Sequence, residues 1–456
     1  MRTMETVRVL APSGMLGAGW DHATVERGIA LGADVISIDG GSTDSGPYYL
    51  GAATAKTTAK AVARDLRSLF TAAAGAGIPV IVGSCGTSGT DRGVDWVAGI
   101  AADVLAEEGL YLKVARIYSE QDATGLKECL DRIHPLPPSG ELDAETLESC
   151  THIVGAMGHE PIVEALRAGA QVVLAGRATD TAVAAAYPLM MGMPPGPTWH
   201  AAKIIECGGQ CTSNPRAGGV LATIDAGGFT IEPLDPTVAC TPISVAAHML
   251  YETADPFEMR EPAGTLDVRD ARYTAVDDRI VRVEGSRFHL AGQYTVKLEG
   301  ARITGYETVS FSAIRDPLIL ADVGAWANLM RTMITQRVRQ TLELADDEYA
   351  FDLRLYGHNA VLDDLEPESG PPREVGVMLL VNAPDQATAT AVAKVANPLM
   401  LHLPAPGMDY LPSLAFPFSP AEIERGAAYE FVLNHVVDCA DPAELFRTEL
   451  GEKTHA

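Results

Sequence analysis

The chain of 456 residues is longer than one ordinary folded core, so its length predicts two or three domains. Its composition, 47% hydrophobic and 21% charged, is typical of a globular protein, and 34 Lys and Arg against 60 Asp and Glu give a formal net charge of −26. Nucleic acids and anionic membranes bind to clustered basic residues. Because the chain has no run of basic residues, we do not expect it to bind either of them.

The N-terminal residues, the apolar stretches and the cysteines give no sign of secretion. Residues Met1–Leu10 lack the apolar core of a signal peptide, and no uncharged apolar stretch is long enough to span a membrane. The seven cysteines are odd in number and scattered, which argues against a disulfide scaffold. Cys207 and Cys211 lie close together, but no second pair and no histidine at zinc-finger spacing follows them. We therefore expect a cytoplasmic protein.

The first half of the chain alternates short apolar runs with Ala-rich amphipathic stretches. The runs are rich in β-branched residues, as expected of strands buried on both faces. The expected strands are Val7–Ala11, Val35–Asp39, Val80–Ser84, Val114–Tyr118, Ile153–Gly155 and Val172–Ala175, and the helices between them include Ala52–Ala74, Val94–Glu107 and Pro161–Ala168. This alternation predicts an α/β domain over residues 1–225, with a Rossmann-like, doubly wound parallel sheet.

The pattern changes near Gly227. Residues 226–345 form a β-rich segment with alternating pieces such as Gln293–Leu298, and a helix within Asp322–Leu344 closes it. Residues 346–456 alternate strand-like and helical stretches without a regular repeat, so we expect an α+β C-terminal part.

Four strand ends in the first half carry loops rich in Gly, Ser, Thr and Asp. They read IDGGSTDSG after Val35, GSCGTSGTD after Val80, GRATD at a helix start, and IIECGG near residue 206. Ligands of open α/β sheets bind beyond the carboxyl ends of the strands, where glycines let backbone N–H groups approach and Ser and Thr add hydroxyls. The loops therefore predict one shared ligand site.

The candidate catalytic residues are the acids and the thiol of these loops: Asp39, Asp44, Cys85 and Glu206. The candidate substrate-binding residues are Gly40, Gly41, Ser42, Thr43, Ser45, Ser84, Thr87, Ser88, Arg177, Thr179, Asp180, Cys207 and Gly208. Asp39 or Asp44 is expected to act as the general base, with Glu206 as the second choice. Arg177, at a helix start, suits a small anionic substrate. No cofactor is firmly expected, although the Asp loops could hold a divalent metal.

Simpler interpretations stay open for several of these residues. Cys85 also fits a small buried hydrophobic residue, and Thr179 and Asp180 fit ordinary helix caps. The stretch SGMLGAG at Ser13–Gly19 follows the first strand, but its glycine order differs from the dinucleotide-binding fingerprint. An NAD(P)-dependent oxidoreductase is therefore a lesser alternative.

The motifs IDGGSTDSGPYYLG, GSCGTSGTD, GRATDTAV, KIIECGG and LRLYGHN, in this order, resemble the acyclic terpene utilisation (AtuA-like) family over roughly residues 5–400. The resemblance implies a cytoplasmic bacterial protein of branched-acid or acyl-CoA catabolism. Many members of this kind act with a small separate partner protein, and the tail at residues 418–447 is similar to that partner. A fused partner domain would bring Arg425, Tyr429, Asn434 and His435 to the site.

The leading functional expectation is a lyase (a hydratase or dehydratase) or an isomerase. Its substrate would be a small hydroxy- or unsaturated carboxylate, or the CoA thioester of such an acid. The alternatives are the oxidoreductase and a non-catalytic accessory subunit that binds an acyl-CoA or carboxylate for a carboxylase complex. A homo-oligomer is expected because most cytoplasmic enzymes form one.

Overall fold

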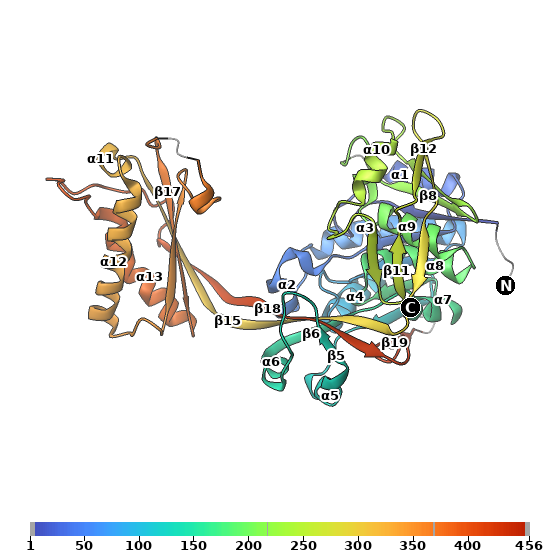
Figure 1. Cartoon of the computed structure of the whole chain (residues 1–456), viewed down its shortest axis with the longest axis horizontal. Coiled ribbons are helices and arrows are strands. Elements are labelled where there is room, and N and C mark those ends of the chain that lie inside the picture. Colours follow the sequence, from blue (N-terminus) through green and yellow to red (C-terminus); the bar gives the residue numbers. More distant parts are fainter. Residues whose placement is uncertain (1–4, 217, 368–369, 452–456) are drawn as a thin grey trace. The chain divides into compact units, whose positions relative to one another are not determined.

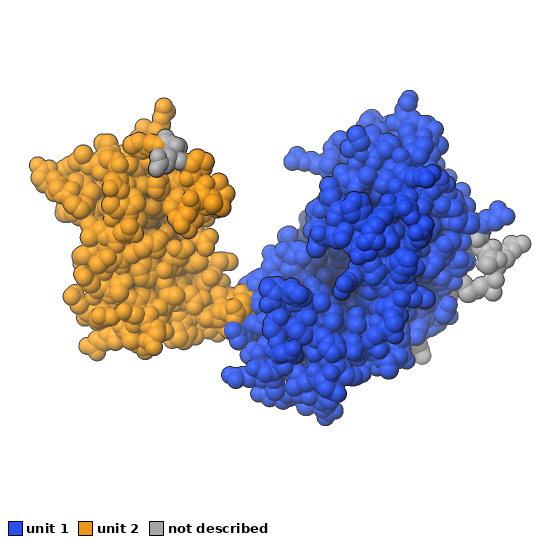
Figure 2. All heavy atoms as spheres, viewed as in Figure 1, with its two compact units in different colours: residues 1–302, 431–456 blue, residues 303–430 orange. Residues whose placement is uncertain are grey.

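The computed structural model describes residues 5–216, 218–367 and 370–451, which form two compact units (Figures 1 and 2). Unit 1 comprises residues 1–302 and 431–456, and unit 2 comprises residues 303–430. The chain passes from unit 1 to unit 2 within β15 (Tyr294–Ile314) and returns within β18 (Glu422–Cys439). Unit 2 is therefore inserted into unit 1 along the sequence.

Unit 1 is built on a ten-stranded sheet with the order β12-β13-β9-β8-β1-β2-β3-β7-β4-β19. The middle strands are parallel: β1 (Thr6–Ala11), β2 (Val35–Asp39), β3 (Val80–Gly83), β7 (Val172–Ala175) and β4 (Val114–Tyr118). The strands on both sides are antiparallel: β8 (Val220–Asp225), β9 (Gly228–Pro233), β13 (Val281–Glu284), β12 (Arg272–Ala275) and β19 (Arg447–Leu450). The expected parallel sheet is thus the central part of a mixed sheet, in which short turns join β8 to β9 and β12 to β13 as antiparallel hairpins.

Helices cover both faces of the parallel strands. Leu10, Ile36 and Val82 face a core formed with α1 (His22–Ala30), α3 (Ala59–Ala76) and α4 (Asp91–Glu107). Val9, Val35 and Val173 face the opposite core, formed with α7 (Glu160–Arg167), α8 (Asp180–Met190) and α9 (Pro195–Ile205). The connection after β3 leads to α4 and the connection after the adjacent β7 leads to α8, on the other face. Such a reversal opens a crevice at the carboxyl ends of the two strands.

The remaining elements of unit 1 surround this sheet. A three-stranded sheet contains β10 (Glu258–Glu261), β11 (Gly264–Asp267) and β14 (Arg287–Leu290), while β5 (Ile133–Pro135) pairs with β18 and β6 (Cys150–Ala156) pairs with β15. The shorter helices are α2 (Pro47–Gly51), α5 (Ala123–Lys127), α6 (Ala144–Ser149), α10 (Pro242–His248) and the 3₁₀ helices η1 (Thr43–Ser45) and η3 (Gly208–Cys211). The strand expected at Ile153–Gly155 thus lies in β6, outside the central sheet.

Unit 2 packs helices on one face of a sheet (Figure 1). The sheet contains β16 (Ala350–Tyr356), β17 (Val375–Ala383) and β15, all antiparallel, and the helices are α11 (Pro317–Leu320), α12 (Val323–Leu342) and α13 (Gln386–His402). Alternate residues of β17, such as Val377 and Leu379, face Met330 and Val392 of the helices. The buried Trp326 donates a hydrogen bond from Nε1 to the carbonyl oxygen of Leu403 at 3.0 Å.

The two units divide the chain differently from the boundaries expected at residues 225 and 345. Residues 226–302 belong to unit 1 because β9, β13 and β12 extend its central sheet. The tail at residues 418–447 does not form a compact unit of its own. Its residues before 431 lie in unit 2, while the later part of β18 and β19 pair with β5 and β4 in unit 1.

Within the described residues, no helix is long and apolar enough to cross a bilayer. All seven cysteines are free thiols.

Candidate functional site

Two adjoining cavities lie at the carboxyl ends of the parallel strands in unit 1. The first, of about 480 Å³, is the Glu261 cavity, whose lining includes Arg177, Arg260, Glu261, Lys297 and Val436. The second, of about 510 Å³, is the Asp39 cavity, whose lining includes Asp39, Gly41, Ser42, Ser45 and Cys207. Both are lined by Asp44, Asp180, Glu206 and Glu252, so they form one cleft. Each volume lies in the range of small-molecule sites.

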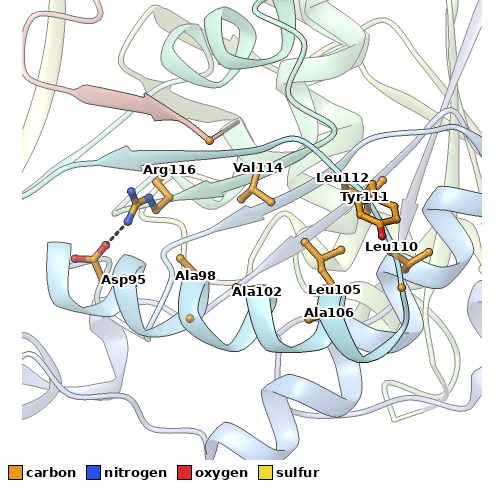
Figure 3. Close-up of a pocket in the computed structure, with 13 residues that line it drawn as sticks. Asp95, Ala98, Ala102, Leu105, Ala106, Leu110, Tyr111, Leu112, Val114 and Arg116 are labelled. Atoms are coloured by element: carbon orange, nitrogen blue, oxygen red, sulfur yellow. Dashed lines mark hydrogen bonds and ion pairs between the residues drawn. The ribbon is translucent and has the colours of Figure 1, made fainter. Parts of the chain in front are cut away.

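A cavity of about 550 Å³ between α4 and β4 has a different character (Figure 3). Its lining consists mostly of small and apolar side chains such as Ala102 and Leu105. Its charged groups, Asp95 and Arg116, form an ion pair with each other at 3.0 Å. This cavity offers an apolar surface but no cluster of groups for acid–base chemistry.

Glu299 on β15 is the centre of a buried ion network beside the Glu261 cavity. Its carboxylate accepts hydrogen bonds from Arg177 Nε at 2.7 Å, Lys297 Nζ at 3.0 Å and Thr43 Oγ1 at 3.1 Å. Burial alone would raise the pKa of Glu299, but the charges of Arg177 and Lys297 outweigh it and lower the pKa to about 2. Glu299 is therefore a permanent carboxylate that holds two cations in place.

Arg177 follows β7 and directs its guanidinium across the crevice. Besides Glu299, its Nη1 donates to Asp180 Oδ1 at 3.2 Å and to Ser84 Oγ at 3.3 Å. With Nε and Nη1 engaged, Arg177 is a fixed positive charge in the cavity wall and not a free bidentate fork. Arg177 lines the Glu261 cavity, and its binding of a small anionic substrate stays a prediction.

Glu261, the last residue of β10, is a buried carboxyl group on the wall of the cavity. Its oxygens accept hydrogen bonds from Thr179 Oγ1 at 2.8 Å and from the Thr181 hydroxyl. Burial raises the pKa of Glu261 to about 7, although the hydroxyl donors act in the opposite direction. A carboxyl group with such a pKa exchanges a proton readily at neutral pH.

Asp39 and Asp180 form a second pair of acids, one at the end of β2 and one at the first turn of α8. Burial, together with the charge of Asp180, raises the pKa of Asp39 well above its ordinary value. Burial also raises the pKa of Asp180, against the effect of Arg177. Two close carboxyl groups do not ionise independently, so this pair retains a proton to a higher pH than an isolated aspartate.

Lys203 near the end of α9 forms a buried ion pair with Glu206, with Nζ 2.5 Å from Oε1. Burial alone would lower the pKa of Lys203, but the Glu206 carboxylate outweighs it and raises the pKa. Beside this pair, the Glu206 carboxylate, the Cys207 thiol and a ring nitrogen of His248 lie within 4.8 Å of one another. Burial and the nearby Lys203 lower the pKa of His248 to about 4, while burial and Glu206 raise the pKa of Cys207.

Several loop residues predicted from the sequence reach the cleft. Asp44 is exposed and lines both cavities, and its Oδ2 accepts a hydrogen bond from Ser42 Oγ at 3.0 Å. Ser45 accepts a hydrogen bond from Lys56 Nζ at 3.3 Å. Thr179 was predicted to be either a helix cap or a residue of the ligand site. In the structure it caps α8 through the N–H of Ala182 and also lines the Glu261 cavity.

The loop after β3 has a structural role instead. The side chains of Ser84, Thr87 and Ser88 are buried and bond to Arg177, to the N–H of Lys56 and to the carbonyl of Tyr49. The thiol of Cys85 is fully buried, burial raises its pKa, and it lines neither cavity. None of these four residues lines either cavity, and the three hydroxyls hold the neighbouring loops together. Their predicted part in substrate binding or catalysis stays a prediction.

Three glycines serve close backbone packing. A Cβ on Gly40 would lie 2.6 Å from the carbonyl oxygen of Gly83, and one on Gly41, at φ +141°, would lie 2.5 Å from the Cα of Thr87. Gly208 has φ +58°, and a Cβ there would lie 2.8 Å from the backbone of Ser13. These glycines bring the loops after β1, β2, β3 and α9 together, since a side chain at any of them would separate the loops.

The tail contributes a different residue from those expected. Asn434 and His435 hydrogen-bond to the carbonyls of Leu136 and Gly140 and line neither cavity, whereas Val436 lines the Glu261 cavity beside Leu136. Arg425 and Tyr429 belong to unit 2, where Arg425 pairs with Glu307 at 2.8 Å.

The residues that sequence analysis missed come mainly from the β-rich segment: Lys203, His248, Arg260, Glu261, Lys297 and Glu299. One signal was present. In the expected strand YTVKLE, side chains alternate between the two faces, so Lys297 and Glu299 lie on the face opposite Val296 and Leu298. A Lys and a Glu two residues apart on one face of a strand are a candidate ion pair. No comparable local pattern distinguishes Glu261 or His248.

Comparison with known proteins shows the family of the chain. The sequence pattern of the acyclic terpene utilisation family protein AtuA matches residues 51–420, well over half of the chain. The chain therefore belongs to the AtuA family. Neither the curated proteins nor the solved structures that were compared include a match to the chain.

Proposed function

We propose that the chain is an acid–base enzyme, a hydratase/dehydratase or an isomerase, acting on a small hydroxy- or unsaturated carboxylate or on its CoA thioester. The observation that carries this proposal is Glu261, a cavity-lining carboxyl group whose pKa is raised to about 7. Perturbed titratable groups in a cleft are typical of active sites, and a pKa near neutrality suits both the uptake and the release of a proton.

The cations of the cleft support an anionic or carbonyl substrate. Arg260 lines the Glu261 cavity, is exposed, and forms no ion pair within the described parts of the chain. Lys297 is anchored to Glu299, yet its side chain is 44% exposed. An overall charge of −26 opposes the approach of anions, so these local cations would bind the substrate carboxylate or polarise its carbonyl.

Dehydration requires two proton transfers that the carboxyl groups can supply. Glu261 takes the proton next to the carbonyl, the carbon–oxygen bond to the hydroxyl group breaks, and a second carboxyl group protonates the departing oxygen so that water leaves. Asp180, which lines the same cavity and has a raised pKa, is the best placed second acid. Hydration is the reverse, and isomerisation returns the proton to another carbon.

The fold indicates where the substrate binds, and the family name indicates which class of substrate to assay first. We infer that the substrate binds as ligands do in Rossmann-like folds, beyond the carboxyl ends of the parallel strands. The cleft lies at this edge, where the connections after β3 and β7 diverge to opposite faces. The family name refers to acyclic terpenes, which are branched, unsaturated compounds. A branched unsaturated acid or its CoA thioester is therefore the first substrate class to assay.

The test is Glu261→Gln, assayed with a panel of hydroxy acids, unsaturated acids and their CoA thioesters. Loss of the proton acceptor should lower kcat by about 10²–10⁴-fold. Glu258→Gln is the matched control, because Glu258 lies on the same strand but pairs with Arg269 at the surface. Equal activity of both variants would contradict the role of Glu261.

Two other results would replace the proposal. If the protein converts no member of the panel but purifies with a carboxylase, the accessory-subunit hypothesis is favoured. If NAD(P) alone raises the melting temperature, the oxidoreductase hypothesis is favoured, because only ligands of the native state stabilise it.

A further inference from the structure

We propose that Glu206, Cys207 and His248 form a binding site for a Zn²⁺ ion. The three residues come from two segments, the end of α9 and the last residue of α10, which pack against each other. One carboxylate oxygen, the thiol sulfur and one imidazole nitrogen lie within 4.8 Å of one another. The inference concerns metal binding itself and holds whether or not the proposed reaction is correct.

The buried state of His248 is an independent reason to expect a ligand here. Its side chain is 4% exposed, and its Nε2 has no hydrogen-bond partner among the described residues. Buried polar atoms are almost always paired with protein, water or an ion. The His248 ring also stacks on Tyr251 at 5.5 Å, which restrains its orientation.

The donor set favours zinc over calcium or magnesium. Thiolate and imidazole are soft or borderline ligands, whereas Ca²⁺ and Mg²⁺ require oxygen. Zinc bonds of about 2.0–2.3 Å place the ligands of a tetrahedral ion about 3.3–3.8 Å apart, so small side-chain rotations from the observed limit of 4.8 Å suffice. Three protein ligands leave a fourth position, and because Glu206 and Cys207 line the Asp39 cavity, that position would face the cleft.

The bond from Lys203 to Glu206 and the proton of the Cys207 thiol both affect how the cluster can bind the ion. Lys203 bonds to Oε1 of Glu206, so the other carboxylate oxygen, Oε2, is the available ligand atom. The thiol must lose its proton to solvent when the metal binds, since the thiolate is the ligand. Uptake of the ion therefore releases the thiol proton and weakens as the pH falls.

The neighbouring cysteine gives a matched comparison. Cys211 lies four residues further on, in η3, but its Sγ is fully buried and donates to the carbonyl of Gly208 at 3.6 Å. Cys207 is close to Cys211 in sequence, but the cluster of possible metal ligands contains Cys207, Glu206 and His248 and not Cys211.

The experiment is titration of the metal-free full-length protein with Co²⁺, a spectroscopic substitute for Zn²⁺. We expect one equivalent to bind with a thiolate-to-cobalt charge-transfer band and to be displaced by Zn²⁺. Cys207→Ala and His248→Ala should each abolish the band, and Cys211→Ala should retain it. Carboxylates of this acidic protein that bind Co²⁺ adventitiously produce no such band.

A second measurement uses the unaltered protein, so a folding defect in a variant cannot decide the outcome. Zn²⁺ should protect Cys207 from alkylation, detected in its peptide by mass spectrometry, without protecting the partly exposed Cys129. Absence of the charge-transfer band in the unaltered protein, its survival in Cys207→Ala, or equal protection of both cysteines would overturn the proposal. None of these readouts depends on turnover.

Discussion

The two units differ in what they bury. Unit 1 encloses charged side chains: Asp39, Asp65, Arg177, Lys203, Glu261 and Glu299. The described residues of unit 2 bury no charged side chain, and their buried polar groups are the hydroxyls of Thr308, Ser310 and Ser312. Replacing buried ion pairs by apolar residues is often neutral or stabilising, so stability alone does not explain those of unit 1. The difference fits the proposal that unit 1 carries the chemistry, whereas unit 2 is held together by packing.

The largest effect is expected from Arg177→Ala in unit 1. The change leaves the carboxylates of Glu299 and Asp180 without their main buried partner and should destabilise the protein by about 3–5 kcal/mol. Chemical unfolding followed by tryptophan fluorescence measures the loss. The control is Arg339→Ala in unit 2, whose surface pair with Asp346 should contribute about 0–1 kcal/mol. Similar losses in both variants would contradict the comparison.

A core change in unit 2 should separate stability from activity. Ile334 on α12 is fully buried, and Ile334→Ala should cost about 2–5 kcal/mol through lost contacts and a cavity. Below its melting temperature this variant should keep full turnover and full cobalt binding. A defect in either property in the folded variant would show that unit 2 takes part in the site.

Glu261→Gln should make the protein more stable at high pH while it lowers activity. The folded pKa of about 7 is above the ordinary value of 4.5, so the folded state binds more protons than the unfolded state between these pH values. Stability therefore falls as the pH rises through this window, by up to about 3 kcal/mol. The variant should lose that dependence. Melting temperatures of both proteins from pH 4 to 9 test this, and parallel curves would be the contrary result.

The smallest effect is expected from Cys85→Ala. Since the thiol is buried and lines neither cavity, the variant should retain turnover and lose about 1 kcal/mol of stability from the small void. Steady-state kinetics and thermal unfolding provide the measurements. A large loss of kcat without a loss of stability would restore Cys85 to the catalytic residues.

The sequence predicted the edge of the sheet at which the cleft lies. Asp39, Asp44, Arg177, Asp180 and Glu206 follow strands or begin and end helices, so their positions at this edge depend on local structure. All five line one or both cavities. Family membership was also predicted, from the order of the loop motifs, and the match of the family over residues 51–420 confirms it.

The other half of the site could not be read from local patterns. Glu299 and Glu261 reach the cleft through strands more than 80 residues away in sequence from Arg177 and Thr179, as their hydrogen bonds show. Ser84 and Cys85 lie in a glycine-rich loop whose sequence is typical of a ligand-binding loop. In the structure this loop is buried against neighbouring loops, and the Ser84 hydroxyl is hydrogen-bonded to Arg177 within the protein. Tertiary pairing, not local propensity, decides both cases.

The insertion of unit 2 into unit 1 has a consequence for biosynthesis. Unit 2 is contiguous in sequence, so it can fold on the ribosome as soon as residues 303–430 have emerged. Unit 1 must wait for residues 431–451, because the later part of β18 supplies Val436 to the cleft and β19 completes the edge beside β4. The part of the molecule that begins first is thus completed last, and nascent chains halted before residue 431 should expose unfinished unit 1 surfaces to chaperones.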